Sequence, residues 1–202
     1  MVGGGARYGS VMRLVDGPRH VTVRVTGYQS PESPSRLWRY SWLAVEGDAD
    51  DGRHVWSFRF PALSSSDAPR VGPWLRSVAV WLDDPEGEPP GRLAFSEPNL
   101  AFRVLRETTQ VRVTVSQEFS PSPVPASRGD YDIDMGLTAG SLRAAADEWD
   151  EECRPFPDVL ATFGPELTDE LQVELLAEVA RWRAERLRRE ATQAEGAEPV
   201  SG

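Results

Sequence analysis

Apolar and polar side chains alternate residue by residue in segment after segment of this chain, which restricts it to folds built around β-strands. The pattern is clearest over residues 20–29, where Val21, Val23 and Val25 are separated by polar residues. A period of two places one face of a strand in the core and the other face in water. We therefore expect antiparallel strands, each buried on one side.

Two further segments are predicted to pair with each other. Each carries large side chains two positions apart: Trp38, Tyr40, Trp42 and Ala44 in the first, and Trp56, Phe58 and Phe60 in the second. The Gly- and Asp-rich stretch 47–52 between them has the composition of a turn. These residues should form an antiparallel hairpin.

A second block of strands is expected after residue 92. Four alternating runs follow one another, over Leu93–Phe95, Leu100–Val104, Val111–Val115 and Tyr131–Leu137, with a long loop from Ser120 to Asp130 before the last. Consecutive strands joined by short turns are normally antiparallel neighbours. We therefore predict one antiparallel, strongly twisted sheet of about seven strands, drawn from both blocks.

Helical spacing of apolar residues appears in three places. The first, over about 69–82, follows a cluster of N-cap residues at 64–67, and the second begins after Thr138 and stops before Pro155. The third is a long helix over 165–190. The sequence therefore predicts an α+β fold with helices on one face of the sheet and a long C-terminal helix.

The same patterns divide the chain into four parts. We expect a partly disordered N-terminal segment over 1–18, an α+β domain over 19–157, the helix over 165–190 and a disordered tail over 191–202. The Ala-, Gly-, Glu- and Pro-rich composition of that tail favours disorder.

Charge excludes several classes of function. The chain has 202 residues, with 32 Asp and Glu against 22 Lys and Arg, a net charge of −10. Such an acidic protein lacks the basic surface that binds nucleic acid, and an anionic membrane would repel it. All of its basic residues are Arg, so chemistry that needs a lysine, such as a P-loop or a Schiff base, is excluded.

Cys153 is the single cysteine, so neither an intrachain disulfide nor a thiolate zinc cage can form. The first residues lack the apolar core of a signal peptide, and no run of apolar residues is long enough for a membrane helix. These features predict a soluble cytoplasmic protein. Neighbouring acids should raise the pKa of Cys153 and make it a poor nucleophile.

Two pairs of residues are candidate chemical sites. Asp132 and Asp134 point the same way from one predicted strand and could bind a metal or act as acid and base, but nothing nearby completes such a site. Charge pairing with Arg residues across the sheet is the ordinary explanation for them. His20 and His54 each enter a predicted strand, yet two histidines are too few for a zinc site without further ligands. We predict no catalytic residue, no metal and no cofactor.

The densest charge lies in Asp147, Glu148, Trp149, Asp150, Glu151 and Glu152, at the C-terminal end of a predicted helix. The helix dipole disfavours acids at that end, so a reason for their presence is needed. One is an acidic surface, anchored by Trp149, that binds a basic protein. The other is a solvated helix face with Trp149 turned inward.

The predicted helix over 165–190 has acids in its first half and Arg in its second half, which suits the helix dipole without any partner. Its apolar residues occupy more than one face. The helix is therefore expected to pack on the sheet or to pair with a second copy of the chain as a homodimer.

Several short strings resemble the WapI family of bacterial immunity proteins, and its actinobacterial members in particular. They are the segments 93–102, 141–151 and 155–157, together with 23–28, 39–42 and 56–59. The resemblance spans about Arg19 to Pro157 and rests on a turn and on packing patterns. The helix over 165–190 lies outside it.

The resemblance implies a function that the composition alone does not give. WapI-type proteins bind and neutralise the C-terminal domain, typically a nuclease, of a WapA-like contact-dependent polymorphic toxin in the cell that makes it. The implied partner is a cognate toxin domain, expected to be basic, and the implied action is non-enzymatic. No binding residue carries over from the family. The alternative is an intracellular ligand-binding or scaffolding domain of unknown role.

Overall fold

The structure is a computed structural model that describes residues 11–33, 36–95, 97, 99–116, 119–121 and 130–157, without the side chains of residues 36–38. The chain divides into two units, Met1–Val159 and Leu160–Gly202, and every described residue belongs to the first. The predicted helix over 165–190, its proposed homodimer contact and the tail over 191–202 therefore lie outside the described residues.

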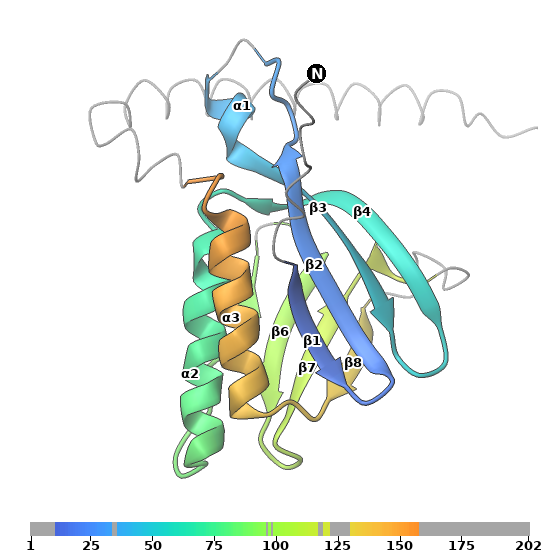
Figure 1. Ribbon diagram of the computed structural model, residues 1–202, viewed down its shortest axis with the longest axis vertical. Helices are drawn as coiled ribbons and strands as arrows, with labels where there is room; N and C mark the ends of the chain where they lie inside the picture. Colours follow the sequence, from blue (N-terminus) through green and yellow to red (C-terminus); the bar gives the residue numbers. More distant parts are fainter. Residues whose placement is uncertain are drawn as a thin grey trace, which may run out of the picture. The chain divides into compact units, whose positions relative to one another are not determined.

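Within these described residues, eight antiparallel strands form two sheets (Figure 1). Sheet A contains β1 (Met12–Asp16), β2 (Arg19–Tyr28), β3 (Trp42–Asp50) and β4 (Val55–Ser64), in that order. Sheet B contains β5 (Leu93–Ala94), β6 (Leu100–Leu105), β7 (Gln110–Val115) and β8 (Tyr131–Met135), also in chain order. Each sheet is thus a meander of neighbouring hairpins.

The prediction of a single sheet of about seven strands is wrong. The two blocks of strands were identified, but they form separate four-stranded sheets. Alternation shows that a strand has one buried face, and it does not show what covers that face. Here α2 and the loop after it separate β4 from β5, and both sheets bury their apolar faces in one common core.

The predicted helices at 69–82 and after Thr138 are confirmed. The first is α2 (Val71–Asp83), entered through a short 3-10 helix at Ala68–Arg70, and the second is α3 (Ala139–Cys153). Thr138 caps α3, since its hydroxyl accepts a hydrogen bond from the Ser141 backbone N–H at 3.1 Å. The two helices lie side by side along one side of the two sheets (Figure 1).

The prediction for the first strand of the hairpin, over residues 38–44, is partly wrong. Residues Arg36–Ser41 form the short helix α1, and the strand β3 begins at Trp42 and runs through the predicted turn to Asp50. The Arg39 guanidinium of α1 donates to the Ser33 carbonyl oxygen at 2.7 Å, which ties this short helix to the segment before it. Aromatic residues at every second position over so short a segment do not distinguish a strand from one turn of helix.

One strand had no predicted counterpart. β1 lies within the segment 1–18 and pairs with β2, with Met12 opposite Val23. Met12 and Leu14 are fully buried. The core of the molecule therefore includes residues from the part of the chain for which disorder was expected.

The core lies between the sheets and is closed on one side by α2 and α3. Phe58 of β4 stacks on Phe119 with ring centroids 4.2 Å apart. The rings of Trp74 in α2 and Phe102 in β6 also pack together, with their centroids 5.7 Å apart. Phe60 shares the predicted aromatic face with Phe58 but is exposed. No helix in the described part of the chain is both long and apolar enough to cross a membrane.

Candidate functional site

The acidic run 147–152 lies at the C-terminal end of α3, as predicted, and its central residue points into the core. Trp149 is 1% exposed, and its indole N–H donates to the backbone oxygen of Ala68 at 2.8 Å. Its burial leaves no aromatic surface for a partner to contact. The inward orientation, one of the two alternatives for Trp149, is the one the structure shows.

Two carboxylates of the run face sheet A and accept hydrogen bonds from its backbone. Glu148 accepts from the N–H of Arg13, on the outer edge of β1, at 3.0 Å, and Glu152 accepts from the N–H of Val25 at 2.9 Å. Because β1 begins at Met12, opposite Val23, the N–H of Val25 lies beyond the end of β1, and within the described part of the chain it has no strand partner on that side. The two acids thus complete the hydrogen bonding of the sheet edge.

Glu152 is nearly buried, at 8% exposure. Burial raises the pKa of this carboxyl group, and the hydrogen bond from Val25 and the nearby charge of Arg24 offset part of that rise. Glu152 is therefore a structural residue of the helix–sheet contact, and a partner cannot reach most of its side chain.

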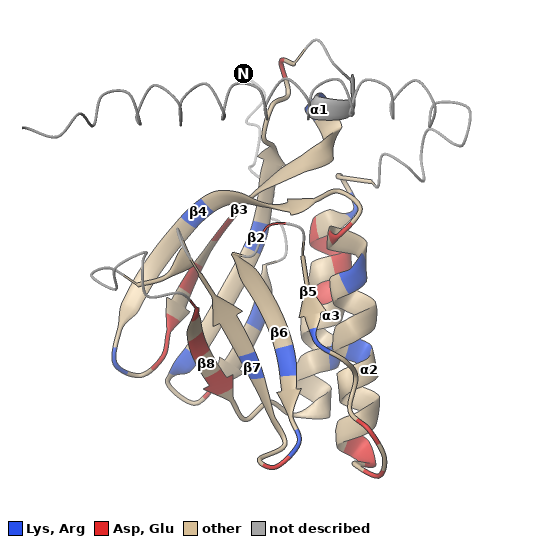
Figure 2. Ribbon diagram, turned by 180° about the vertical axis from the view of Figure 1, so that it is seen from behind, with Lys and Arg blue, Asp and Glu red and all other residues tan. Residues whose placement is uncertain are grey.

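Two other carboxylates face α2. The Arg76 guanidinium lies 2.7 Å from an oxygen of Asp147 and 2.7 Å from an oxygen of Asp150, and these hydrogen bonds raise its pKa. Helix α2 carries Gly72 at this contact, where an added Cβ would clash with the Asp150 carboxylate. The missing side chain at residue 72 leaves room for the Asp150 carboxylate between the helices. Figure 2 shows α2 and α3 side by side, with acidic (red) and basic (blue) residues in the upper part of the pair.

The exposed part of the run is smaller than the sequence suggests. Asp147, Asp150 and Glu151 have exposed side chains, and Glu151 pairs with Arg154 at 2.5 Å. We call these three carboxylates the acidic surface of α3. Arg76 and Arg154 neutralise part of its charge, but all three side chains remain accessible to solvent.

Asp132 and Asp134 on β8 are held by one arginine of the neighbouring strand. Arg112 of β7 contacts Asp134 through two hydrogen bonds, of 2.6 and 2.8 Å, and Asp132 at 2.7 Å. Thr114 also donates to Asp132 at 2.7 Å. The hydrogen bonds from Arg112 lower the pKa of Asp134 more than burial raises it. This is cross-strand charge pairing, the structural alternative for these two acids.

The two histidines occupy different places. His20 lies in β2 opposite Asp50, whereas His54 lies in the turn between β3 and β4. The His54 ring nitrogen Nδ1 is 3.1 Å from the hydroxyl of Tyr131, which donates to Asp51. Among the described residues, no group of three His, Cys, Asp or Glu side chains could hold a metal ion.

The cluster of His54, Asp51 and Tyr131 joins the two sheets, because Tyr131 belongs to β8 and the other two to the turn between β3 and β4. Burial alone would raise the pKa of Asp51, but hydrogen bonds from Tyr131 and from the backbone of His54 and Arg53 lower it overall. Burial and the Asp51 carboxylate raise the pKa of Tyr131 to about 12. Both groups therefore keep their usual protonation state at neutral pH, and the contact fastens the β3–β4 turn to β8.

Cys153, the last residue of α3, has the predicted raised pKa. Burial is the main cause, with Glu152 and Asp150 adding to it, and together they raise the pKa of the thiol to about 12. A thiol with such a pKa is almost entirely protonated at neutral pH and is a weak nucleophile.

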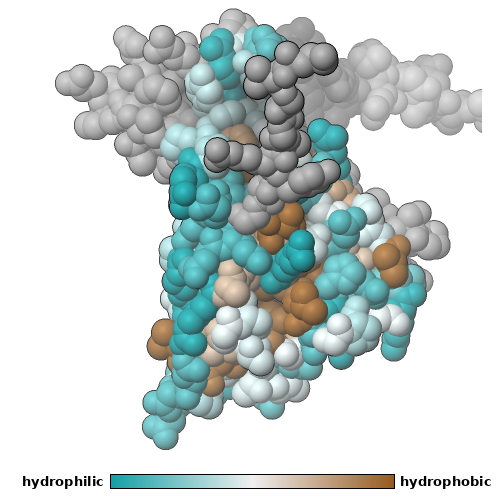
Figure 3. Space-filling view, in the orientation of Figure 1, coloured by the Kyte–Doolittle hydropathy of each residue, from teal (hydrophilic) through white to brown (hydrophobic). Residues whose placement is uncertain are grey.

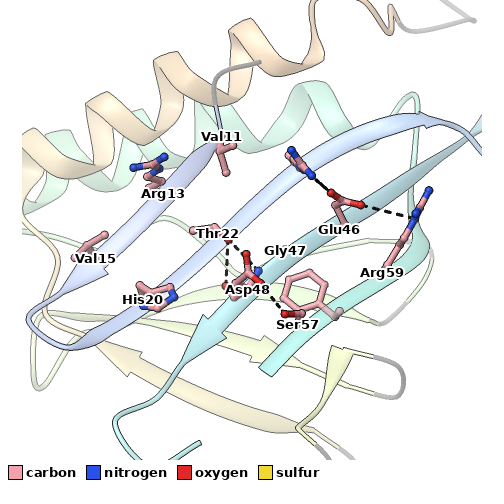
Figure 4. A pocket seen from close by; sticks show the side chains of 12 residues that line it. Val11, Arg13, Val15, His20, Thr22, Glu46, Gly47, Asp48, Ser57 and Arg59 are labelled. Atoms are coloured by element: carbon pink, nitrogen blue, oxygen red, sulfur yellow. Dashed lines mark hydrogen bonds and ion pairs between the residues drawn. The ribbon is translucent and has the colours of Figure 1, made fainter. Parts of the chain in front are cut away.

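A groove of about 760 Å³ lies on the outer face of sheet A, and sequence patterns gave no sign of it (Figure 4). It crosses all four strands, and its lining includes Arg13, Val15, Thr22, Glu46, Asp48 and Arg59. Near its middle, the Thr22 hydroxyl of β2 accepts a hydrogen bond from the Asp48 N–H of β3 at 2.9 Å.

A comparison with known protein families identifies the family of this chain. The model of the WapI-like immunity protein family matches residues 13–157, more than half of the chain. The chain belongs to the WapI-like family of immunity proteins. No curated protein and no solved structure matches this WapI-like chain.

The family match confirms the resemblance found in the sequence and extends it toward the N-terminus. It begins in β1 and ends just after α3, so it includes nearly all of both sheets, the acidic surface and most of the groove of this WapI-like protein. The segment over 165–190 lies outside the match. Neither candidate surface is singled out by the match, because it covers both.

Proposed function

We propose that this chain is an immunity protein that binds and neutralises the C-terminal, nuclease-type domain of a cognate WapA-like contact-dependent toxin in the cytoplasm of the cell that makes both. The observation that carries the proposal is the family match over residues 13–157, which covers nearly all of the described fold. The described unit has a continuous hydrophobic core of its own, as a protein that folds before it binds its partner requires.

The proposed contact is the acidic surface of α3. Its three carboxylates, Asp147, Asp150 and Glu151, are exposed, and the chain as a whole carries a net charge of −10. A nuclease domain that binds nucleic acid has a basic surface, so the two proteins would attract each other over distances of about a Debye length, ~8 Å at physiological salt. Glu148 lies beside this surface, while Trp149 and Glu152 support it from within.

We further propose that inhibition is stoichiometric and involves no chemical step. The acids that would be the first choice for catalysis, Asp132 and Asp134, are both engaged by Arg112. The thiol of Cys153 is protonated at neutral pH because its pKa is raised to about 12. Blocking the partner's surface is the action that the described side chains support.

The test is to express this chain with the C-terminal domain of the toxin gene next to its own. We expect the two proteins to purify together, the cells to survive, and nuclease activity to fall in proportion to the immunity protein added until equal molar amounts abolish it. Complete inactivation by far less than an equal amount would indicate turnover and contradict the stoichiometric mechanism. Failure of the pair to bind would contradict the proposed function.

A further inference from the structure

We infer that the groove on the outer face of sheet A is a second contact surface, which takes an acidic segment of the same toxin domain. This inference rests on the proposed function but uses a different face of the molecule and the opposite charge. The acidic surface of α3 would hold the basic part of the toxin, and the groove would hold a segment carrying carboxylate and apolar side chains.

The first argument is the shape and apolar lining of the groove. It runs across four neighbouring strands, a length of about 14 Å at ~4.8 Å per strand, which an extended segment of about four residues can span. Val11 and Val15 line it, and Val15 is 51% exposed. Figure 3 shows hydrophobic surface along β1 in the middle of this face, next to hydrophilic residues. Exposed aliphatic side chains beside polar ones are typical of contact surfaces between proteins.

The second argument is the local surplus of positive charge. Three arginines line the groove, Arg13, Arg24 and Arg59, against two carboxylates, Glu46 and Asp48. Glu46 is shared, since both Arg24 and Arg59 contact it, and Asp48 already accepts a hydrogen bond from Ser57 at 2.7 Å. Among the described residues no carboxylate forms an ion pair with the Arg13 side chain. An incoming carboxylate could therefore pair with the guanidinium group of Arg13, and with those of Arg24 and Arg59, which share the single carboxylate of Glu46.

The same charges decide between occupants. A second copy of this chain would bring a net charge of −10 toward another −10, which opposes self-association. Nucleic acid would meet the same overall repulsion. An acidic segment of a basic domain avoids this penalty, because the remainder of that domain is attracted to the acidic surface of α3 while its carboxylates pair with Arg13.

Two variants test the groove against the toxin domain encoded beside this gene. Arg13→Glu reverses the unpaired charge, and its control is Arg92→Glu, which makes the same change at an exposed residue outside the groove. Val15→Trp fills the groove without changing charge, and its control is Val55→Trp at another exposed strand residue, outside the groove. We expect each groove variant to weaken the complex about tenfold or more, mainly through faster dissociation, and each control to bind as wild type does.

Each other result has a definite meaning. Unchanged affinity in Arg13→Glu and Val15→Trp would overturn the groove as a contact surface while leaving the proposed function intact. Equal weakening by Arg92→Glu would show that total charge is responsible, which also overturns it. Self-association of the wild type that Val15→Trp abolishes would assign the groove to a second copy. If the wild type does not bind the toxin domain at all, the proposed function fails and this inference fails with it.

Discussion

Trp149 lies in the middle of the acidic run, yet its side chain is part of the core. Truncating Trp149 to Ala should lower the free energy of unfolding by ~3–5 kcal/mol, because it removes a large buried side chain and leaves a cavity. Trp149→Phe keeps most of the apolar area but leaves the Ala68 oxygen without its donor, for a loss of ~1–3 kcal/mol. Denaturant unfolding measures both. Weaker toxin binding at unchanged stability would contradict this assignment.

Glu152 predicts a dependence of stability on pH with an unusual sign for a carboxyl group. Burial raises its folded pKa above the ordinary value of 4.5, so the folded protein holds this proton more tightly than the unfolded chain. Its contribution to stability is therefore largest below pH 4.5 and is lost as the pH rises through the folded pKa. Glu152→Gln removes that loss and can still accept from Val25.

We expect the stability of Glu152→Gln relative to wild type to increase as the pH rises from about 4 to about 7. Asp51 and Asp134, whose pKa values are lowered, contribute in the opposite direction in both proteins, so the difference between the two curves isolates residue 152. Parallel curves would show that Glu152 has an ordinary pKa in the folded state. Unfolding in urea at each pH supplies the data.

At the scale of elements, the contact between α2 and α3 depends on a glycine. Replacing Gly by Ala in an exposed helix interior normally stabilises a protein by ~1 kcal/mol, but Gly72 is buried and lies in the first turn of α2. Gly72→Ala should instead destabilise this one, because the new Cβ displaces the Asp150 carboxylate from Arg76. In an Asp150→Ala background the clash is gone and Gly72→Ala should stabilise. A double-mutant cycle in urea measures this coupling, and additive effects would contradict it.

The elements also show which sequence patterns are informative. The helix after Thr138 was predicted correctly because a cap, an apolar stripe and a following proline all agreed. The segment at Arg36–Ser41 was predicted wrongly because a short aromatic alternation had no independent support. β1 was missed because it has two buried residues, Met12 and Leu14, and is defined by its pairing with β2. The two strands are joined by a tight turn at Gly17, but the five residues of β1 are too few for their alternation to identify a strand.

For the whole molecule, net charge predicts how the toxin complex forms. Reversing Asp147 and Glu151 to Arg should slow association by about tenfold at low salt, and the wild-type rate should fall as salt increases. The control reverses Glu86 and Glu107, two exposed acids elsewhere, and has the same net charge. Stopped-flow mixing with the toxin domain gives the rates. Equally slow association of both variants would show that net charge alone is responsible and that the acidic surface of α3 has no particular role.

At this scale the sequence predicted the fold class but not the assembly of the strands. Alternation identified most strands of both blocks, and it could not tell one sheet of about seven strands from two sheets of four, because each arrangement buries the same faces. The candidate site was predicted in part. The acidic run is where it was expected, but the inward direction of Trp149 and Glu152 and the groove on sheet A depend on tertiary contacts.

The carboxylates of Glu148 and Glu152 occupy backbone donors along the β1 side of sheet A. An unprotected strand edge is a template on which other chains can add strands, and such addition leads to aggregates. In this protein the β1 edge is closed by α3, so within the described residues further growth of sheet A is left to β4 at its opposite end. Part of what looked like a surface for recognition therefore also protects the protein against self-assembly.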